Sequence, residues 1–329
     1  MTSSSPRLLG ERRIYRFIPA AALALAFLNP YLFSSRAALA GMAFGAQSKD
    51  AAPAPAQTPP APSSPPTKQA PVKEAPTGNP RLNSVVKSTI ALVVDAKTSE
   101  ELVVKNADRV VPIASITKLM TAMVVLDAKL PMDEKLKISE DDRDLLMGTT
   151  SRLRVGWSFS REELLHLALT ASENRAAAAL SRYYSGGRPA FIEAMNAKAA
   201  ELGMTKTHFV NPNGLNNENV SNAFDLAKLV RAADQYPLIR EFTTDPRYNV
   251  RVGGYVLGYY NPDRLVGRPN WDIQVQKTGF TNQAGRCLVM WINAEGRELI
   301  MVFLDSYGKL TRFADARRVL MQLAVLEKK

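Results

Sequence analysis

Two residues in the stretch PIASITKLMTAM have the types and spacing to activate a serine. Ser115 and Lys118 stand three positions apart, and on a helix this spacing places both side chains on one face, about 5 to 6 Å apart at Cβ. A lysine that is buried near another cation loses its proton more readily, and its neutral amine can then accept the serine proton. Ser115 would then be a nucleophile for acyl transfer, with a helix N-terminus beside it for the oxyanion.

A second group, Ser172-Glu173-Asn174, falls in a predicted turn between two helices. Ser172 could relay a proton from Lys118 to a leaving amine, and the amide of Asn174 could orient the lysine and hold a substrate carbonyl. Glu173 would point elsewhere. Helix capping by the serine and the asparagine explains the same residues without catalysis.

A third group, Lys277-Thr278-Gly279, follows the strand-like stretch WDIQVQ. Lys277 would supply positive potential that lowers the pKa of Lys118, and Thr278 could bind a substrate carboxylate. Gly279 would leave the strand face open to substrate, and the N–H of Phe280 would be a second oxyanion donor.

Taken alone, a Ser-x-x-Lys pair is weak support for a nucleophilic serine. Ser84 and Lys87 form a second match at the edge of a proline-rich stretch. The order of the three groups and their different settings make the set much more specific. Helix start, inter-helix turn and strand are the settings that such a site requires.

The elements that position these groups can be predicted from hydrophobic periodicity. Strands are predicted over 88–95, 101–105, 248–260, 271–277, 285–293 and 297–304, and helices from residue 115 and over 161–169, 174–184, 189–202 and 311–326. Strands at both ends with helices between them predict an α+β fold, in which one sheet carries a helical lobe at roughly 120–233. The groove between sheet and lobe is the natural place for a site.

The first 87 residues differ in composition from the rest. Residues 1–40 combine an arginine-rich start, an apolar run over 17–33 and an Ala-Leu-Ala sequence at 38–40, which is typical of a secretory signal peptide. If the signal is not cleaved, residues 17–33 would tether the protein to a membrane. The Ala/Pro-rich composition of residues 41–87 predicts a disordered spacer, and the folded domain is expected over 88–329.

Charge and cysteine content exclude several classes of function. The chain has 329 residues and a net charge of +11, which suits an exported protein drawn to an acidic polymer or to anionic lipid. Nucleic acid is not expected as a partner, because the basic residues are scattered along the sequence. Cys287 is the only cysteine, so no intrachain disulfide can form. The only histidines are His166 and His208, so we expect no metal, and we expect no cofactor.

Over roughly 88–326 the sequence resembles the serine D-alanyl-D-alanine peptidases, the low-molecular-mass penicillin-binding proteins. The likeness is carried by PIASITKLMTAMVVLDAKLPMDEKL, SENRAAAAL, AFIEAMNAKAAELGM and QKTGFTNQAGRCLVM, and the three groups match the triplet of penicillin-binding proteins and class A β-lactamases. The resemblance implies a β-lactamase/DD-peptidase-like fold, an exported periplasmic location and peptidoglycan as substrate. It also implies covalent inhibition by β-lactam antibiotics.

The resemblance also implies a role for each group. Ser115 would be the nucleophile and Lys118 the general base, with Ser172 and Asn174 as the second element and 277–279 as the third. Residues 211–215 (NPNGL) match a family loop, although a turn built on Asn and Gly explains them equally well. Only 50 residues follow Gly279, which leaves no room for the extra C-terminal domain of many carboxypeptidase relatives and favours an endopeptidase that cleaves D-alanyl-diaminopimelate crosslinks.

Three alternatives stay open at this point. A carboxypeptidase that trims pentapeptide stems would use identical chemistry. A peptidoglycan-binding or β-lactam-sensing module would be acylated without turnover, although it would not need the base and the relay. A β-lactamase would need a glutamate for deacylation; the stretch 218–222 (ENVSN) has a suitable spacing, but its polar character predicts a surface turn.

Overall fold

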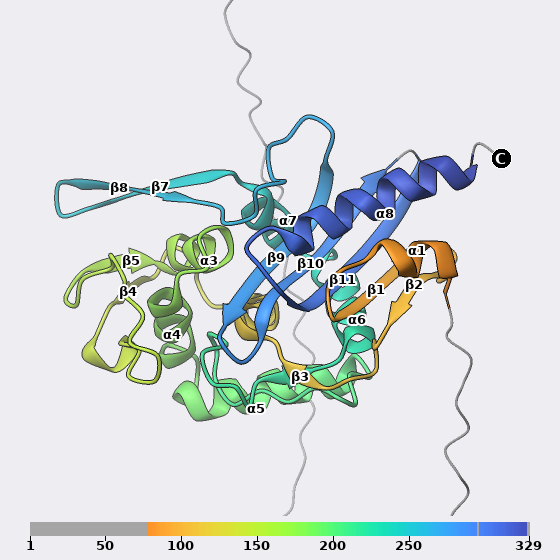
Figure 1. Cartoon of the computed structure of the whole chain (residues 1–329). Helices are drawn as coiled ribbons and strands as arrows, with labels where there is room; N and C mark the ends of the chain where they lie inside the picture. Colours follow the sequence, from red (N-terminus) through yellow and green to blue (C-terminus); the bar gives the residue numbers. More distant parts are fainter. Residues whose placement is uncertain (1–77, 295, 328–329) are drawn as a thin grey trace, which may run out of the picture. The chain divides into compact units, whose positions relative to one another are not determined.

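The central sheet joins the two ends of the described chain. The computed structural model describes residues 78–294 and 296–327. Five antiparallel strands lie in the order β2-β1-β11-β10-β9, and Ile90 of the first long strand pairs with Leu304 of the last. The predicted α+β fold, an antiparallel sheet with helices inserted between its strands, is confirmed (Figure 1).

The strands are β1 (Ile90–Asp95), β2 (Glu101–Lys105), β3 (Val111–Pro112), β4 (Lys135–Lys137), β5 (Ser158–Ser160), β6 (Val220–Ser221), β7 (Arg247–Val252), β8 (Tyr255–Tyr260), β9 (Asp272–Thr281), β10 (Gly285–Ala294) and β11 (Arg297–Ser306). The helices are α1 (Pro80–Val85), the 3₁₀ turn η1 (Ala114–Ile116), α2 (Thr117–Asp127), the 3₁₀ turn η2 (Glu140–Asp142), α3 (Arg161–Thr170), α4 (Asn174–Arg182), α5 (Gly187–Glu201), α6 (Ala223–Ala233), α7 (Pro237–Thr244) and α8 (Thr311–Glu327).

Each long strand is buried on both faces, because side chains alternate between two separate cores. On one face, odd-numbered residues of β1 and β11 pack with α1 and α8, as Figure 1 shows for the helices. On the other face, even-numbered residues of the same strands pack against α6 and the helical lobe. The two-sided burial explains why these strands read as continuous apolar runs in the sequence.

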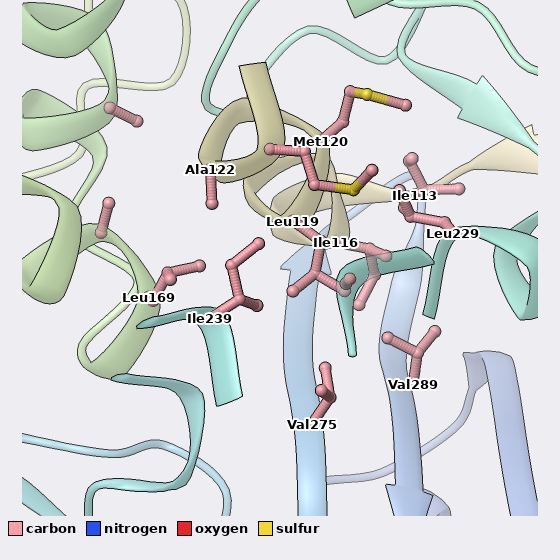
Figure 2. Packing of buried hydrophobic residues seen from close by; sticks show 14 of the residues in the cluster. Ile113, Ile116, Leu119, Met120, Ala122, Leu169, Leu229, Ile239, Val275 and Val289 are labelled. Carbon is pink, nitrogen blue, oxygen red and sulfur yellow. The ribbon is translucent and has the colours of Figure 1, made fainter. Parts of the chain in front are cut away.

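Helix α2 connects the lobe to the sheet. Figure 2 shows Ile116 and Leu119, at the start of this segment, in one cluster with Val275 of β9 and Val289 of β10. Nine of the eleven residues of α2 are buried, so the helix lies inside the molecule and not on its surface. Its start is therefore held rigidly against the sheet.

The folded part starts earlier than the boundary expected at residue 88. Helix α1 covers 80–85, with Asn79 as its N-cap and Leu82 fully buried in the core beneath α8. The proline-rich composition before it concealed this short helix, since Pro80 occupies the first helical turn, where proline is tolerated. The predicted signal peptide and most of the predicted spacer lie outside the described residues.

The stretch 248–260 is not a strand of the central sheet. It forms the separate hairpin β7–β8, which turns at Gly253 and Gly254, both with positive φ (53° and 80°). Two consecutive residues with positive φ are what a tight hairpin turn requires, and only glycine adopts them without strain. None of the helices within the described residues is long and apolar enough to span a bilayer.

Candidate active site

Ser115 lies in the tight turn η1, directly before α2, and two glycines hold this turn from either side. A Cβ at Gly279 would lie 2.9 Å from the Ile113 carbonyl oxygen and 3.2 Å from the Ser115 nitrogen. A Cβ at Gly214 would lie 2.0 Å from the Ala114 carbonyl oxygen. We expected Gly279 to leave the strand open to substrate; the structure fills that space with the backbone of η1 instead.

The turn is also strained. Ala114 has φ at 49°, in the left-handed region that a residue with a Cβ rarely adopts. Such conformations persist only where the surroundings enforce them, and they are concentrated at functional sites. The backbone before Ser115 is thus fixed by its packing between Gly214 and β9.

Lys118 is fully buried, and its Nζ has three oxygen partners. Nζ lies 2.9 Å from Ser115 Oγ, 2.7 Å from Asn174 Oδ1 and 2.7 Å from the carbonyl oxygen of Asn213. The structure therefore brings together the serine and the lysine of the first group and the asparagine of the second.

The second group occupies the turn between α3 and α4, as predicted. Ser172 has φ at 60°, and its Oγ accepts a hydrogen bond of 3.0 Å from Lys277 Nζ. Asn174 is the first residue of α4, and its Nδ2 donates to Thr149 Oγ1 at 3.1 Å. Thus Asn174 holds Lys118 with one end of its amide and the neighbouring loop with the other.

The third group lies on β9, which is an edge strand of the sheet next to η1. Lys277 is buried, and besides Ser172 its Nζ donates to the carbonyl oxygen of Thr278 at 3.0 Å. The Thr278 hydroxyl has no hydrogen bond within the part of the chain that the structure describes. Phe280 is half exposed at the end of this row, where the Arg286 guanidinium stacks on its ring 4.3 Å from the centroid.

Burial sets the electrostatics of the two lysines. Burial holds the pKa of Lys118 well below its usual range, and the charge of Lys277 lowers it further, whereas Glu173 opposes the shift. Burial lowers the pKa of Lys277 to about 7. The predicted influence of Lys277 on Lys118 is confirmed, although desolvation is the larger cause.

Glu173 was expected to point elsewhere, but it contributes to the surroundings of Lys118. Its carboxylate is mostly buried, accepts a hydrogen bond from the Arg175 backbone at 3.0 Å and caps α4. Burial raises the pKa of Glu173. Its electrostatic effect on Lys118 makes it part of the surroundings of the base.

The loop 211–215 belongs to the site. Its explanation as a simple turn built on Asn and Gly did not predict these contacts. Its Asn213 carbonyl binds Lys118, its Pro212 carbonyl accepts from Thr121 Oγ1 at 2.6 Å, and Gly214 packs on the turn η1. The likeness of NPNGL to a family loop was the only signal for this in the sequence.

Asn219 fastens that loop, and sequence reasoning missed it. The stretch 218–222 was predicted to be a surface turn, but Asn219 is fully buried. Its Oδ1 accepts from the Val210 and Asn211 backbone N–H groups at 2.9 and 3.1 Å, and its Nδ2 donates to Thr117 Oγ1 at 3.0 Å. The side chain thus ties the loop to the first residue of α2; Glu218 alone is exposed.

A family model and several known proteins match this chain. The model, described as D-alanyl-D-alanine carboxypeptidase, matches residues 75–308. A D-alanyl-D-alanine endopeptidase of Pseudomonas aeruginosa is 50% identical over 240 residues, which are 72% of this chain and 77% of that protein. Another of that name, from Escherichia coli, is 49% identical over 236 residues, covering 71% of this chain and 76% of the relative.

Solved structures resemble the fold over a similar length. A DD-transpeptidase of Streptomyces superposes with a TM-score of 0.66 at 27% identity, covering 71% of this chain and 96% of that one. Penicillin-binding protein D2 of Listeria monocytogenes, solved in an ampicillin-bound form, gives 0.61 at 33% identity, covering 72% of this chain and 96% of the other.

Proposed function

Because the chain belongs to the D-alanyl-D-alanine carboxypeptidase family, we propose that it is a serine D-alanyl-D-alanine endopeptidase that hydrolyses D-alanyl-diaminopimelate crosslinks in peptidoglycan. The relatives that are 49% and 50% identical bear the endopeptidase name, whereas carboxypeptidases match at 28 to 31%. The observation that carries the chemistry is the arrangement of oxygen atoms around Lys118 Nζ.

That arrangement directs the lone pair of a neutral amine at Ser115. The carbonyl oxygens of Asn174 and Asn213 can only accept, so a neutral Lys118 donates its two N–H groups to them. The remaining position on Nζ, where the lone pair lies, faces Ser115 Oγ at 2.9 Å. Lys118 is therefore oriented to accept the Ser115 proton, which is what a general base must do.

In the proposed acylation, Ser115 Oγ attacks the carbonyl carbon of the penultimate D-alanine while its proton passes to Lys118. The resulting oxyanion accepts hydrogen bonds from the backbone N–H groups of Ser115 and Phe280. As the C–N bond breaks, Ser172 passes a proton from the Lys118 ammonium to the leaving amine. Water then hydrolyses the ester, with Lys118 again taking the proton.

We further propose that Lys277 and Thr278 bind a carboxylate of the substrate. Lys277 already holds Ser172, so a charged Lys277 would place the carboxylate and the relay hydroxyl next to each other. The same contact would serve β-lactam antibiotics, which carry a carboxylate; the Listeria relative was solved with one bound. Acylation of Ser115 by a β-lactam would then inhibit the enzyme.

Activity on peptidoglycan requires export, and we propose a periplasmic location. The basic and apolar start of the sequence supports a signal for export, and residues 17–33 would tether the protein to the inner membrane if they are retained. Mass spectrometry of the protein recovered from a periplasmic fraction would give its first residue. A chain that still begins before residue 17 would support the tether.

A carboxypeptidase is the second candidate, since the matching family model is described by that activity. One experiment separates the two. The full-length protein is incubated with a D,D-crosslinked muropeptide dimer and a pentapeptide monomer in one tube, and both are followed by mass. Conversion of the dimer to monomers supports the endopeptidase, whereas loss of only the terminal D-alanine supports the carboxypeptidase.

The control is Ser115→Ala, which keeps the fold but removes the nucleophile. It should cleave neither substrate and should not be labelled by a fluorescent penicillin. If the wild-type protein is labelled but releases no product from either substrate, the chain is a sensing module and the proposal is wrong.

A further inference from the structure

A cavity lined by four arginines lies on the α8 face of the sheet. It has a volume of about 600 Å³, is open to solvent, and lies between the loop that leads into β9 and the first half of α8. Arg264 and Arg268 come from the loop, Arg317 and Arg318 come from the helix, and Trp271 forms part of the wall. The size falls within the range of sites for small molecules.

No carboxylate lines this cavity, and part of its positive charge is uncompensated. Within the described residues, Arg264 and Arg317 make no ion pair. Arg268 Nε donates only to the carbonyl oxygen of Arg264. Arg318 alone is engaged, with Asp315 and with the Val85 carbonyl oxygen.

The surroundings of the cavity hold two further arginines, Arg312 and Arg286, beside one buried carboxyl, Asp263. Arg312, on the same helix, is mostly buried, and its Nε has no hydrogen-bond partner within the described residues. Burial lowers the pKa of Arg312 to about 10; the Asp263 carboxyl opposes this shift, whereas the positive charges of Arg286 and Arg264 add to it by repulsion. An anion in the cavity would relieve this repulsion.

The cavity does not belong to the site around Ser115. Leu265 and Phe313, which line it, are members of the core between the sheet and α8, whereas the residues around Ser115 pack in the core on the other face. A ligand bound here would therefore not compete with a substrate at Ser115.

We propose that this cavity binds the carboxylates of an uncleaved stem peptide of peptidoglycan. This second contact would hold the polymer while another peptidoglycan strand is bound at Ser115. This inference rests on the proposed function, because it takes the polymer as the substrate. Guanidinium groups bind carboxylates through paired hydrogen bonds, and stem peptides present several carboxylates in a short length. Trp271 and the apolar side chains would cover the aliphatic parts of the stem.

Binding to insoluble peptidoglycan tests the proposal. Two full-length proteins are sedimented with purified sacculi. The parent carries Ser115→Ala, so that it cannot digest the polymer, and the cavity variant carries Arg264→Gln/Arg317→Gln in addition. Loss of two charged contacts should weaken the binding about tenfold or more. The matched control is Arg109→Gln/Arg251→Gln, which removes the same charge from two exposed arginines elsewhere and should bind like the parent.

Activity and competition complete the test. With Ser115 intact, Arg264→Gln/Arg317→Gln should digest sacculi more slowly and still cleave the soluble crosslinked dimer at the wild-type rate. A soluble tripeptide muropeptide, which has no bond to cleave, should displace the protein from sacculi more effectively than inorganic phosphate does.

Two results would overturn the cavity assignment. Equal binding by the cavity variant and the control variant would mean that only overall charge matters, and displacement by phosphate but not by the muropeptide would assign the cavity to another anion. Failure of the wild-type protein to cleave the dimer would contradict the proposed function instead, and the sedimentation result would still report on the cavity.

Discussion

Lys118 is the residue whose loss should affect chemistry most directly. Among the residues that the structure describes, its Nζ is the one hydrogen-bond partner of Ser115 Oγ, at 2.9 Å. We expect Lys118→Ala to slow acylation by a fluorescent penicillin by about 10²- to 10⁴-fold, the usual contribution of a general base. Stopped-flow labelling measures the rate, and an unchanged far-UV circular dichroism spectrum verifies the fold. A rate within twofold of wild type would rule out Lys118 as the base.

Lys277 should set the alkaline limit of activity. Its pKa of about 7 means that its charge, which we assign to carboxylate binding, is present below pH 7 and is lost as the pH rises through that value. Acylation by a β-lactam that carries a carboxylate should therefore decline above pH 7. Lys277→Arg should move this decline to higher pH, because a guanidinium keeps its proton. An alkaline limit that stays in place in Lys277→Arg would assign it to another group.

At the scale of elements, the distance between β9 and the turn η1 decides whether Ser115 is positioned. Gly279→Ala would put a methyl group 2.9 Å from the Ile113 carbonyl oxygen, and backbone on both sides leaves little freedom to relax. We expect penicillin labelling to fall about tenfold or more, as a small misplacement of reacting groups can cost this much. Gly258→Ala is the control, since its methyl group would meet mainly flexible side chains on the hairpin. Equal rates in the two variants would show that η1 tolerates displacement.

Asn219 links two elements, so its removal should affect both stability and rate. Asn219→Ala leaves the half-buried backbone N–H groups of Val210 and Asn211 without their partner, and it removes the buried contact to Thr117. We expect the free energy of unfolding in urea to fall by about 2 to 4 kcal/mol. Labelling should slow as well, because the loop that carries Asn213 is released. Asn216→Ala, which loses only one exposed contact to Glu218, should change neither.

The same elements show what a sequence can and cannot predict. The five strands of the central sheet and the helices α2 to α5 and α8 were predicted to within a few residues, because their periodicity is local, whereas the short strands β3 to β6 and the helices α1, α6 and α7 were not. Asn219 was missed because a buried asparagine with all its partners present reads in sequence as a polar surface residue. The hairpin β7–β8 was read as one strand, since Gly253 and Gly254 were not recognised as its turn. The two glycines around η1 depend on contacts between distant segments, which no local pattern reveals.

For the molecule as a whole, Asp315 joins the start of the folded chain to its last helix. This fully buried carboxylate accepts hydrogen bonds from the Lys87 and Ser88 backbones at 2.8 and 2.7 Å. Asp315→Ala should lower the free energy of unfolding by about 3 kcal/mol, since buried donors lose a charged partner. The labelling rate of the folded protein should stay near wild type, because α8 lies on the face of the sheet opposite the lobe. A large loss of rate without loss of stability would contradict this division of roles.

The helical insert was also predictable, since strands at both ends of the chain require the helices to lie between them. The arginine cavity was not predictable. Its arginines come from two segments separated by β9, β10 and β11, and along the sequence they look scattered. Only the folded arrangement gathers them around Trp271.

The pairing of β1 with β11 has a consequence for how the protein is made. Ile90 cannot find Leu304 until almost the whole chain has left the ribosome, so the central sheet must assemble late. Contacts this distant in sequence make folding slow, because a long loop must close before the β1–β11 pairing is gained. For the export proposed above, such a delay is favourable: β1 can pair early with β2, but its other edge has no partner until the last strand has been synthesised.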